Sequence, residues 1–202
     1  PLVFNSIYTS EHYDARLEQP GWSSPGFDDS AWGGVMYRGA PSQRVTAQQT
    51  VPIRNVTEYR PRSVRKLDER SYLYDFGQNM AGVTKLRLRG EAGTQLRLIH
   101  AERLREDGHA DLSNIDVYFR PTDKDDLFQT DVVTLSGRDD EFMPRFNYKG
   151  FRYVEVVADR PVELSAENLT AYAMHSDVTP VGHIETSNDL VDKPVSYTHL
   201  TL

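Results

Sequence analysis

Residues 83–100 read VTKLRLRGEAGTQLRLIH, and this stretch indicates the fold class most clearly. Leu86 and Leu88 alternate with basic residues, and the alternation returns after the glycine-bearing turn 90–93. A period of two is typical of a strand that buries one face, and two such runs around a short turn indicate a hairpin. The stretch therefore predicts antiparallel strands over a one-sided core.

Similar runs continue along the chain. Residues 131–135, 151–156 and 169–174 are rich in β-branched and aromatic residues, and polar residues, Gly or Pro follow each of them. No segment has the period of an amphipathic helix of any length. We therefore predict an all-β fold, with an antiparallel β-sandwich or jelly roll over residues 56–178.

Residues 1–55 have a different texture, rich in Gly, Pro, Ser and aromatic residues, with the turn-forming run PGWSSPG at 20–26. Too few strands are expected here to close a domain. We interpret 1–55 as the C-terminal part of a preceding β-sandwich whose earlier strands lie upstream.

Three further segments stand apart. A long connection at 104–127 is expected to be functional, docked on a neighbour or mobile, and its residues do not choose among these. Residues 179–190 are expected to lead into a further domain, with Ser187 or Asn188 capping a helix. Residues 191–202 complete no element and are expected to be artefactual.

Composition excludes several classes of function. The chain has no cysteine, which excludes disulfides, thiolate metal sites and a cysteine nucleophile. Its net charge of −7 argues against nucleic acid as a partner, because phosphate binding needs clustered Lys and Arg. No apolar run is long enough to span a membrane, so no membrane partner is expected.

Catalytic motifs are also missing. A glycosidase needs two opposed carboxyl groups, but the acidic clusters lie beside turn residues and are interpreted as solvated turns. No His-Glu-x-x-His spacing and no Gly-x-Ser-x-Gly elbow occurs. The run 77–82 bears glycines between two expected strands and indicates a tight hairpin or a bulge. The acidic clusters are Asp28-Asp29, Asp123/Asp125/Asp126 and Asp139-Asp140-Glu141.

One cluster has the composition of a sugar site. Carboxylates and an arginine beside aromatic rings can bond sugar hydroxyls while a ring stacks on the pyranose. The alternative is that Asp14 or Glu11 pairs with Arg16 to fix a loop and that Trp22 lies in a core. The candidate carbohydrate-binding residues are Glu11, Tyr13, Asp14, Arg16 and Trp22.

Several ordered motifs resemble the bacterial α-L-rhamnosidases. Residues 11–16, with 20–22 and 27–32, resemble the end of that family's N-terminal β-sandwich, and residues 74–82 resemble the opening of its concanavalin-like domain. Residues 144–156 resemble the closing signature of that domain, and 174–177 with 187–190 resemble the passage into the catalytic domain.

The resemblance implies a non-catalytic β-region of a larger enzyme that hydrolyses terminal α-L-rhamnose with inversion. The catalytic α/α barrel would begin just after residues 187–190, and no residue here matches the family's catalytic motif. Its implied partners are that barrel and, through the full-length parent, rhamnose-containing glycans. Phe76, Phe146, Phe151 and Tyr153 are then expected to fill the core, and Gly77, Gly82 and Gly150 to set turns.

A second reading is a free-standing rhamnose-binding module. Some relatives bind rhamnose with calcium on an N-terminal sandwich, and the nearest matching stretch is 11–16, preceded here by Thr9 and Ser10 instead of the family's Asp, Asn or Gly. We expect no cofactor unless calcium binds there. The sequence leaves the compartment open, with the periplasm or secretion slightly favoured over the cytoplasm.

Overall fold

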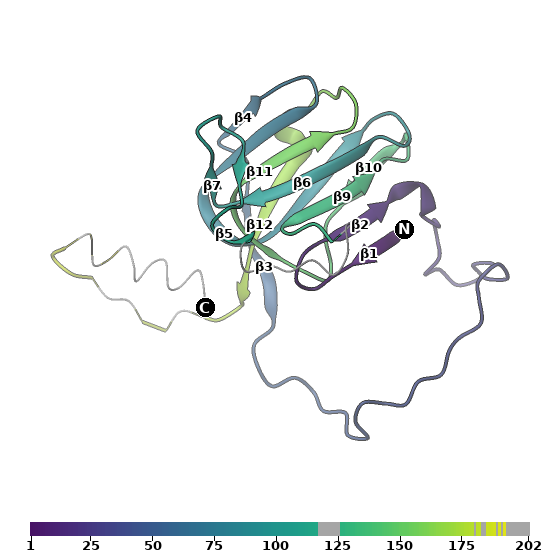
Figure 1. Cartoon of the computed structure of the whole chain (residues 1–202). Helices are drawn as coiled ribbons and strands as arrows, with labels where there is room; N and C mark the ends of the chain where they lie inside the picture. The colour runs from purple at the N-terminus through teal and green to yellow at the C-terminus, as the bar shows by residue number, and fades with distance from the viewer. Residues whose placement is uncertain (117–125, 180, 183–184, 189, 191, 193–202) are drawn as a thin grey trace.

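The computed structural model describes residues 1–116, 126–179, 181–182, 185–188, 190 and 192. Its main element is a ten-stranded sheet in the order β1-β2-β9-β6-β11-β5-β12-β3, with β4 and β10 also paired to β5 (Figure 1). The strands of this sheet are β1 (Leu2–Asn5), β2 (Glu11–Asp14), β3 (Ile53–Tyr59), β4 (Ser63–Lys66), β5 (Ser71–Arg89), β6 (Gln95–Ala101), β9 (Thr130–Thr134), β10 (Asp139–Phe142), β11 (Lys149–Ala158) and β12 (Leu169–Ser176). The predicted all-β fold is confirmed.

The two halves of the predicted sandwich are parts of one curled sheet, because the 19-residue strand β5 runs through both (Figure 1). Residues 71–75 pair with β4 and β11, whereas residues 82–89 pair with β10 and β12. These pairings are antiparallel, as predicted. The parallel pairing of β2 with β9 is an exception that the sequence did not indicate.

A bulge interrupts β5 at residues 76–79. Phe151 lies opposite Met80 and Tyr153 opposite Asp75, so the segment 75–80 of β5 is longer than the segment 151–153 of β11 that it faces. Gly77 takes a left-handed φ of 79° there, and Asp75 Oδ1 accepts its N–H at 2.7 Å. Of the two readings of this run, hairpin or bulge, the bulge is correct.

The other two glycines do not set turns, so that expectation was wrong for them. Gly82 lies inside β5, where a Cβ would come within 2.0 Å of the Tyr172 carbonyl oxygen. Gly150 lies inside β11. A close approach of two backbones explains Gly82 better than a turn does.

The core lies inside the curl and is built from alternate residues. Leu86, Leu88, Leu96 and Leu98 are buried, as their alternation predicts. They pack in one cluster with aromatic and β-branched side chains, among them Tyr74, Phe76, Phe151, Val154 and Val156.

Two of the predicted core aromatics lie elsewhere. Phe146 is 56% exposed, because it belongs to the loop before β11 and not to a strand. Tyr153 is half-buried, with the Arg152 guanidinium 4.8 Å from its ring centre. The irregularity between Phe151 and Tyr153 moves the inward-facing positions from Phe151 to Val154 and Val156, which leaves Tyr153 at the margin.

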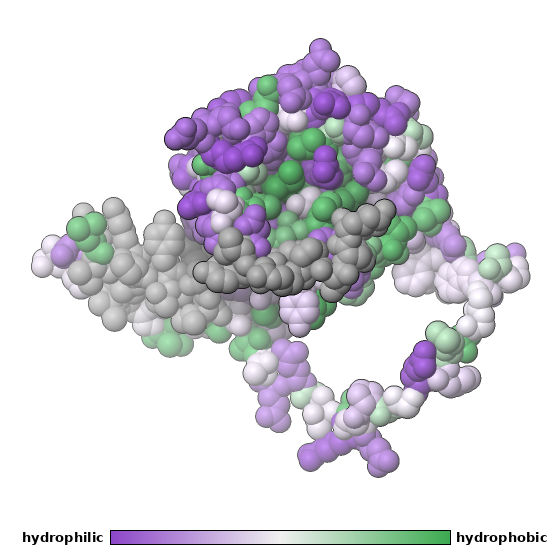
Figure 2. All heavy atoms as spheres, in the orientation of Figure 1, coloured by the Kyte–Doolittle hydropathy of each residue, from purple (hydrophilic) through white to green (hydrophobic). Residues whose placement is uncertain are grey.

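Residues 18–52 form no strand, and most of this segment stands away from the body as an open ring, visible in Figures 1 and 2. The connection 104–127 includes the short ribbon of β7 (Arg103–Leu104) and β8 (Ala110–Asp111) at its start, and residues 117–125 lie outside the described part. The ribbon is docked on the sheet, since the Ala110 N–H donates to Glu155 Oε2 at 2.8 Å.

At the C-terminal end, Asn188 Oδ1 accepts the Leu190 N–H at 3.0 Å, and residues 190 and 192 are helical, in line with the predicted helix start. The predicted tail 191–202 lies outside the described residues except for Asp192. No described helix has the length and apolar character needed to cross a membrane.

Candidate functional site

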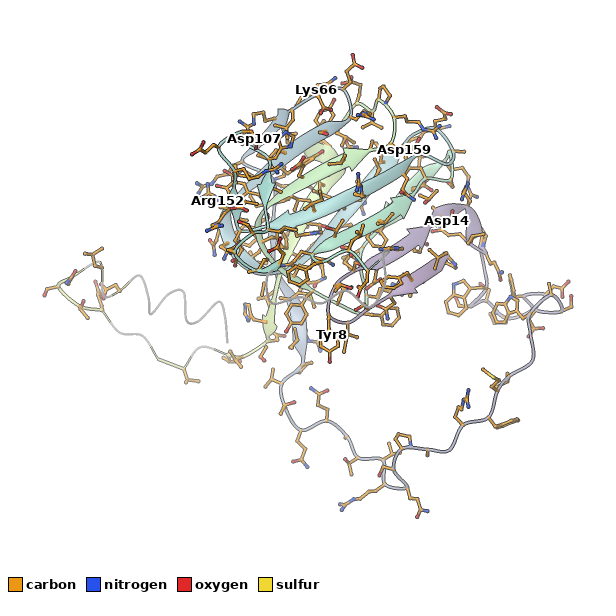
Figure 3. All side chains as sticks on the ribbon, in the orientation of Figure 1. Tyr8, Asp14, Lys66, Asp107, Arg152 and Asp159 are labelled. Carbon is orange, nitrogen blue, oxygen red and sulfur yellow. The ribbon has the colours of Figure 1, made fainter. Side chains whose placement is uncertain are left out.

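The five predicted sugar-binding residues separate into two groups. Glu11, Tyr13 and Asp14 lie on β2, Arg16 lies in the 3-10 turn η1 (Ala15–Leu17), and Trp22 follows in a run of turns. Figure 3 shows Asp14 at the end of β2 next to η1 and Tyr8 at the opposite end of these strands. Tyr13 and Trp22 line a common hollow, whereas Glu11, Asp14 and Arg16 do not.

Glu11 is held inside the protein, with only 2% of it exposed. Its Oε1 accepts the backbone N–H groups of Arg145 at 2.8 Å and Phe146 at 2.6 Å. Burial raises the pKa of the Glu11 carboxyl, against the opposing effect of the two backbone donors. Glu11 therefore fixes the loop 145–146 against β2 and has no free edge for a sugar hydroxyl at Oε1.

Asp14 and Arg16 form the ion pair that the alternative reading anticipated. The guanidinium Nε and Nη2 of Arg16 donate to the two carboxylate oxygens of Asp14 at 2.9 and 2.7 Å. Asp14 also accepts the Arg16 backbone N–H at 3.0 Å, which caps η1. The bond from Arg16 lowers the pKa of the Asp14 carboxyl. The other half of that reading, Trp22 in a core, was wrong, because Trp22 is 62% exposed.

The hollow has a volume of about 740 Å³ and lies between β1, β2, the turns after η1 and the loop before β11. Consecutive turns place its tryptophans: the Trp22 N–H donates to Gln19 O at 3.2 Å, and the Trp32 N–H donates to Asp29 O at 2.9 Å. Gly21, with a φ of 78°, permits the first of these turns. The lining side chains that carry the argument below are Tyr13, Glu18, Trp22, Trp32, Arg145 and Phe146.

The polar groups of the hollow are partly engaged. The Tyr13 hydroxyl donates to Glu18 Oε1, and Trp32 Nε1–H donates to Gln19 Oε1 at 2.7 Å. Burial, followed by the bond to Glu18, raises the pKa of the Tyr13 hydroxyl. Tyr13 therefore stays a neutral donor at physiological pH, and the surface of the hollow is mainly apolar.

Several of these residues escaped the sequence-based selection. Trp32 belongs to a quoted motif but lies ten residues beyond Trp22, and the turns that join them have no period to detect. Phe146 and Arg145 come from the far end of the chain. Their backbone amides are bound there by Glu11 of β2.

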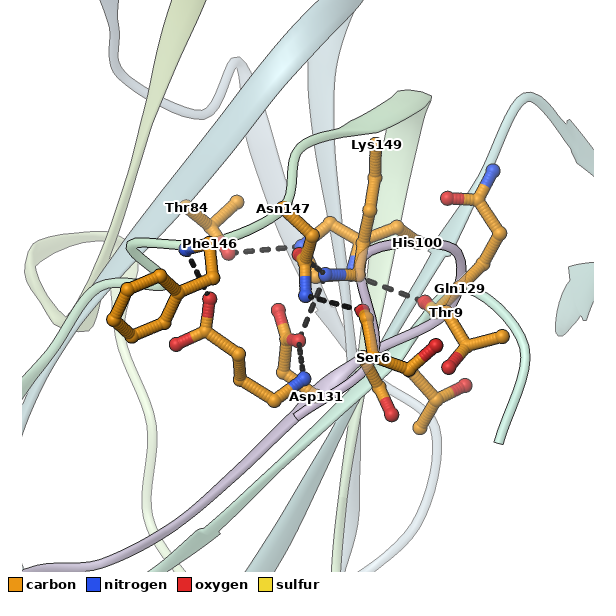
Figure 4. A network of polar contacts seen from close by, with 12 residues as sticks. Ser6, Thr9, Thr84, His100, Gln129, Asp131, Phe146, Asn147 and Lys149 are labelled. Carbon is orange, nitrogen blue, oxygen red and sulfur yellow. Dashed lines mark hydrogen bonds and ion pairs between the residues drawn. The ribbon is translucent and has the colours of Figure 1, made fainter. Parts of the chain in front are cut away.

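A buried polar network ties β2 to the sheet (Figure 4). Asp131 Oδ1 accepts Lys149 Nζ at 2.7 Å and the Glu11 N–H at 2.9 Å. Lys149 also donates to Asn147 Oδ1 at 2.6 Å. Because Lys149 and Asp131 are both buried, the pair depends on these partners, although Asp131 Oδ2 is buried without one among the described residues.

His100 is a second buried part of this network. Its Nδ1 faces the Gln129 carbonyl oxygen at 3.2 Å and must therefore carry the proton, so Nε2 accepts from the Thr84 hydroxyl at 2.9 Å. Burial, and then the charge of Lys149, lower the pKa of His100 to about 4. His100 is thus neutral at physiological pH and serves as a structural group.

A metal does not fit the stretch 11–16. The nearest carboxylates, Glu11 and Asp14, are engaged by backbone amides and by Arg16, which leaves no oxygen-rich cage for calcium. Among the described residues, no group of three or more His, Cys, Asp or Glu side chains could hold a metal ion.

Comparison with known proteins agrees with this architecture. Residues 65–175 match the family described as the bacterial alpha-L-rhamnosidase concanavalin-like domain, and residues 1–57 match the alpha-L-rhamnosidase N-terminal domain. Curated α-L-rhamnosidases of Streptomyces avermitilis and an Alteromonas species are 38% and 31% identical, each over 96% of this chain. The chain spans only 18–20% of their length.

Solved structures give the same result. The S. avermitilis α-L-rhamnosidase complexed with L-rhamnose superimposes with a TM-score of 0.82 at 37% identity, over 97% of this chain and 18% of that one. The α-L-rhamnosidase of Aspergillus terreus superimposes with a TM-score of 0.77 at 34% identity, over 96% of this chain and 21% of that one. With more than half of its residues matched by the concanavalin-like domain, the chain belongs to the bacterial α-L-rhamnosidase family.

Proposed function

We propose that this chain is a non-catalytic β-region of an α-L-rhamnosidase and supports the enzyme's catalytic α/α barrel. The full-length enzyme would remove terminal α-L-rhamnose from glycosides or polysaccharides. The observation that carries the proposal is that buried carboxylates in the described residues are engaged in structural contacts. Glu11 holds two backbone amides, and Asp131 is paired with Lys149.

The same holds for other carboxylates of the sheet. Glu155 accepts from His109 Nδ1 at 2.7 Å and from the Ala110 N–H, and so holds the β7–β8 ribbon. Asp75 accepts two bonds of 2.9 Å from Arg152. An inverting hydrolase needs one protonated carboxyl and one free carboxylate about 6.5–9.5 Å apart with water between them. Carboxylates engaged in this way support a scaffold role.

Incubation of the purified chain with an aryl α-L-rhamnoside tests the proposal. We expect no release of the aryl group above the buffer rate, while a full-length enzyme of the family releases it in the same assay. Catalytic turnover by the chain alone, abolished by a single carboxylate substitution, would overturn the proposal.

A second candidate function is rhamnoside binding in the hollow. The hollow has a volume of about 740 Å³ and is lined by two tryptophans, Tyr13 and Phe146. Apolar clefts with few polar groups are the usual binding sites for small ligands. Tyr13 and Trp22 would contact the sugar, while Glu11, Asp14 and Arg16 would act by holding β2 and η1 in place.

Calorimetry with L-rhamnose and a rhamnosyl disaccharide, each with and without calcium, tests this binding. Trp22→Ala should abolish the heat, because the side chain is exposed and its loss leaves the fold intact. Asp14→Ala should weaken binding less, and calcium should change nothing. No heat with either sugar would exclude a saccharide site in the hollow and leave the scaffold role untouched.

A further inference from the structure

The hollow contains a cation without a protein partner. The backbone N–H of Arg145 is bound to Glu11, but its guanidinium has no hydrogen bond or ion pair within the part of the chain that the structure describes. Its charge reaches the neighbouring Tyr13 hydroxyl, whose pKa it lowers against the larger effect of burial. Arg145 therefore stands at the aromatic wall of the hollow with its donors free.

The negative charge in the lining does not neutralise this arginine. Glu18 is the carboxylate of the lining, and one of its oxygens accepts from Tyr13. Some arginines elsewhere in the fold are matched directly by a carboxylate. Arg152 forms two bonds to Asp75, and Arg160 lies 2.8 Å from Glu91. No such carboxylate faces Arg145 among the described residues.

A free guanidinium beside ring faces selects a particular ligand. Rings stack on the apolar face of a pyranose, and the planar fork of an arginine matches a carboxylate through two parallel bonds. We propose that the hollow binds an acidic saccharide, with a uronate carboxylate on Arg145 and a sugar ring on Trp22. The proposal deepens the second candidate function and rests on it. A volume of about 740 Å³ has room for more than one sugar ring.

The test compares two probes that differ by one group. A rhamnosyl–glucuronic acid disaccharide and its carboxyl-reduced counterpart, a rhamnosyl–glucose, are titrated into the intact chain by calorimetry at about 50 mM salt. The acidic disaccharide should bind about tenfold or more tightly than the neutral one, as expected for a charge-assisted pair. Its advantage should shrink at about 500 mM salt.

Variants assign the effect to Arg145. Arg145→Gln should remove the preference for the acidic probe, and Arg145→Lys should keep part of it, because the lysine retains the charge but not the fork. Arg44→Gln, which makes the same charge change at an exposed arginine outside the lining, is the matched control and should change nothing. Pro1 also lines the hollow, so its α-ammonium group is a second positive charge there. A chain extended by a few residues before Pro1 moves this charge away from the hollow and should keep the preference for the acidic probe.

The outcomes separate the two proposals. Equal binding of both disaccharides, unaffected by Arg145→Gln, would overturn the acidic ligand and leave the hollow as a neutral saccharide site. The proposal of an acidic ligand on Arg145 would also be overturned if the preference for the acidic disaccharide remained in Arg145→Gln. It would likewise be overturned if that preference disappeared in the chain with the N-terminal extension. No heat with either probe would overturn both the acidic ligand and the saccharide site.

Discussion

Phe151 and Phe146 lie five residues apart in one signature, yet they occupy opposite environments. Phe151 is fully buried against Phe76 and His100, with ring centroids 6.0 and 4.9 Å away. Phe146 borders the hollow. Phe151→Ala should therefore lower the free energy of unfolding by about 3–5 kcal/mol, and Phe146→Ala by less than about 1 kcal/mol.

Urea unfolding followed by circular dichroism measures both values. Similar losses for the two variants would contradict the assignment of Phe151 to the core and of Phe146 to the hollow. Phe146→Ala should weaken saccharide binding in the hollow, because Phe146 lines the hollow and Phe151 does not.

His100 makes stability depend on pH in a predictable direction. Burial holds the pKa of His100 at about 4 in the folded chain, against 6.5 for the free side chain, so protons bind the unfolded chain first. Its contribution to stability is complete above about pH 6.5 and falls by about 1.4 kcal/mol per pH unit down to about pH 4.

His100→Gln removes the titrating group and keeps an amide that can bond to Thr84 and Gln129. Urea unfolding at pH 7 and at pH 5 should show a smaller acid loss for the variant than for the unaltered chain. Equal losses would mean that His100 is not a buried neutral group.

Among the elements, β2 links the edge strand β1 to the rest of the sheet. It pairs with β9 at only three positions, His12 to Asp14, and depends on Glu11 to hold the loop 145–146. Glu11→Ala would leave two amides without their acceptor, at a cost of about 2–4 kcal/mol. Hydrogen exchange should accelerate first in residues 1–17 and 145–147.

The matched control is Glu106→Ala, which removes an exposed carboxylate that lies outside β2 and the loop 145–146 and should leave exchange in β2 unchanged. A uniform acceleration through β6 and β11 in Glu11→Ala would contradict a local role for Glu11.

Strand β5 depends on a close approach to β12 at Gly82. A Cβ there meets backbone, which cannot rotate away, whereas at Gly77 it meets the flexible side chain of Arg62. Gly82→Ala should therefore cost about 3 kcal/mol or more and Gly77→Ala about 1–2 kcal/mol. Gly33→Ala, with nothing within 4 Å, should be neutral. Thermal melts rank the three, and a reversed order for Gly82 and Gly77 would exclude this register of β5 and β12.

The elements were largely predictable from sequence because each strand contains its own alternation. Leu86, Leu88, Leu96 and Leu98 point inward as that alternation requires. Long-range geometry was not predictable. The irregular pairing at the bulge 76–79 changes which alternate residues of β11 face the core. The parallel pairing of β2 with β9 has no local signature. Arg145 and Trp22 line the same hollow only in the folded chain.

On the scale of the whole molecule, the sheet is one compact body and most of the segment 18–52 extends from it (Figure 1). Strands β1 and β2 are bonded to the same sheet as β3 to β6 and β9 to β12, and the division of the chain near residue 55 stays a prediction. The chain spans about a fifth of the length of its curated relatives, and the activity of the parent stays a proposal.

The central claim is that this region supports hydrolysis without performing it. The most direct test replaces the matching region of the S. avermitilis relative with this chain and measures release of the aryl group from an aryl α-L-rhamnoside. We predict turnover by the chimera and none by the chain alone at equal concentration. Turnover by the isolated chain at the rate of the chimera would contradict the account.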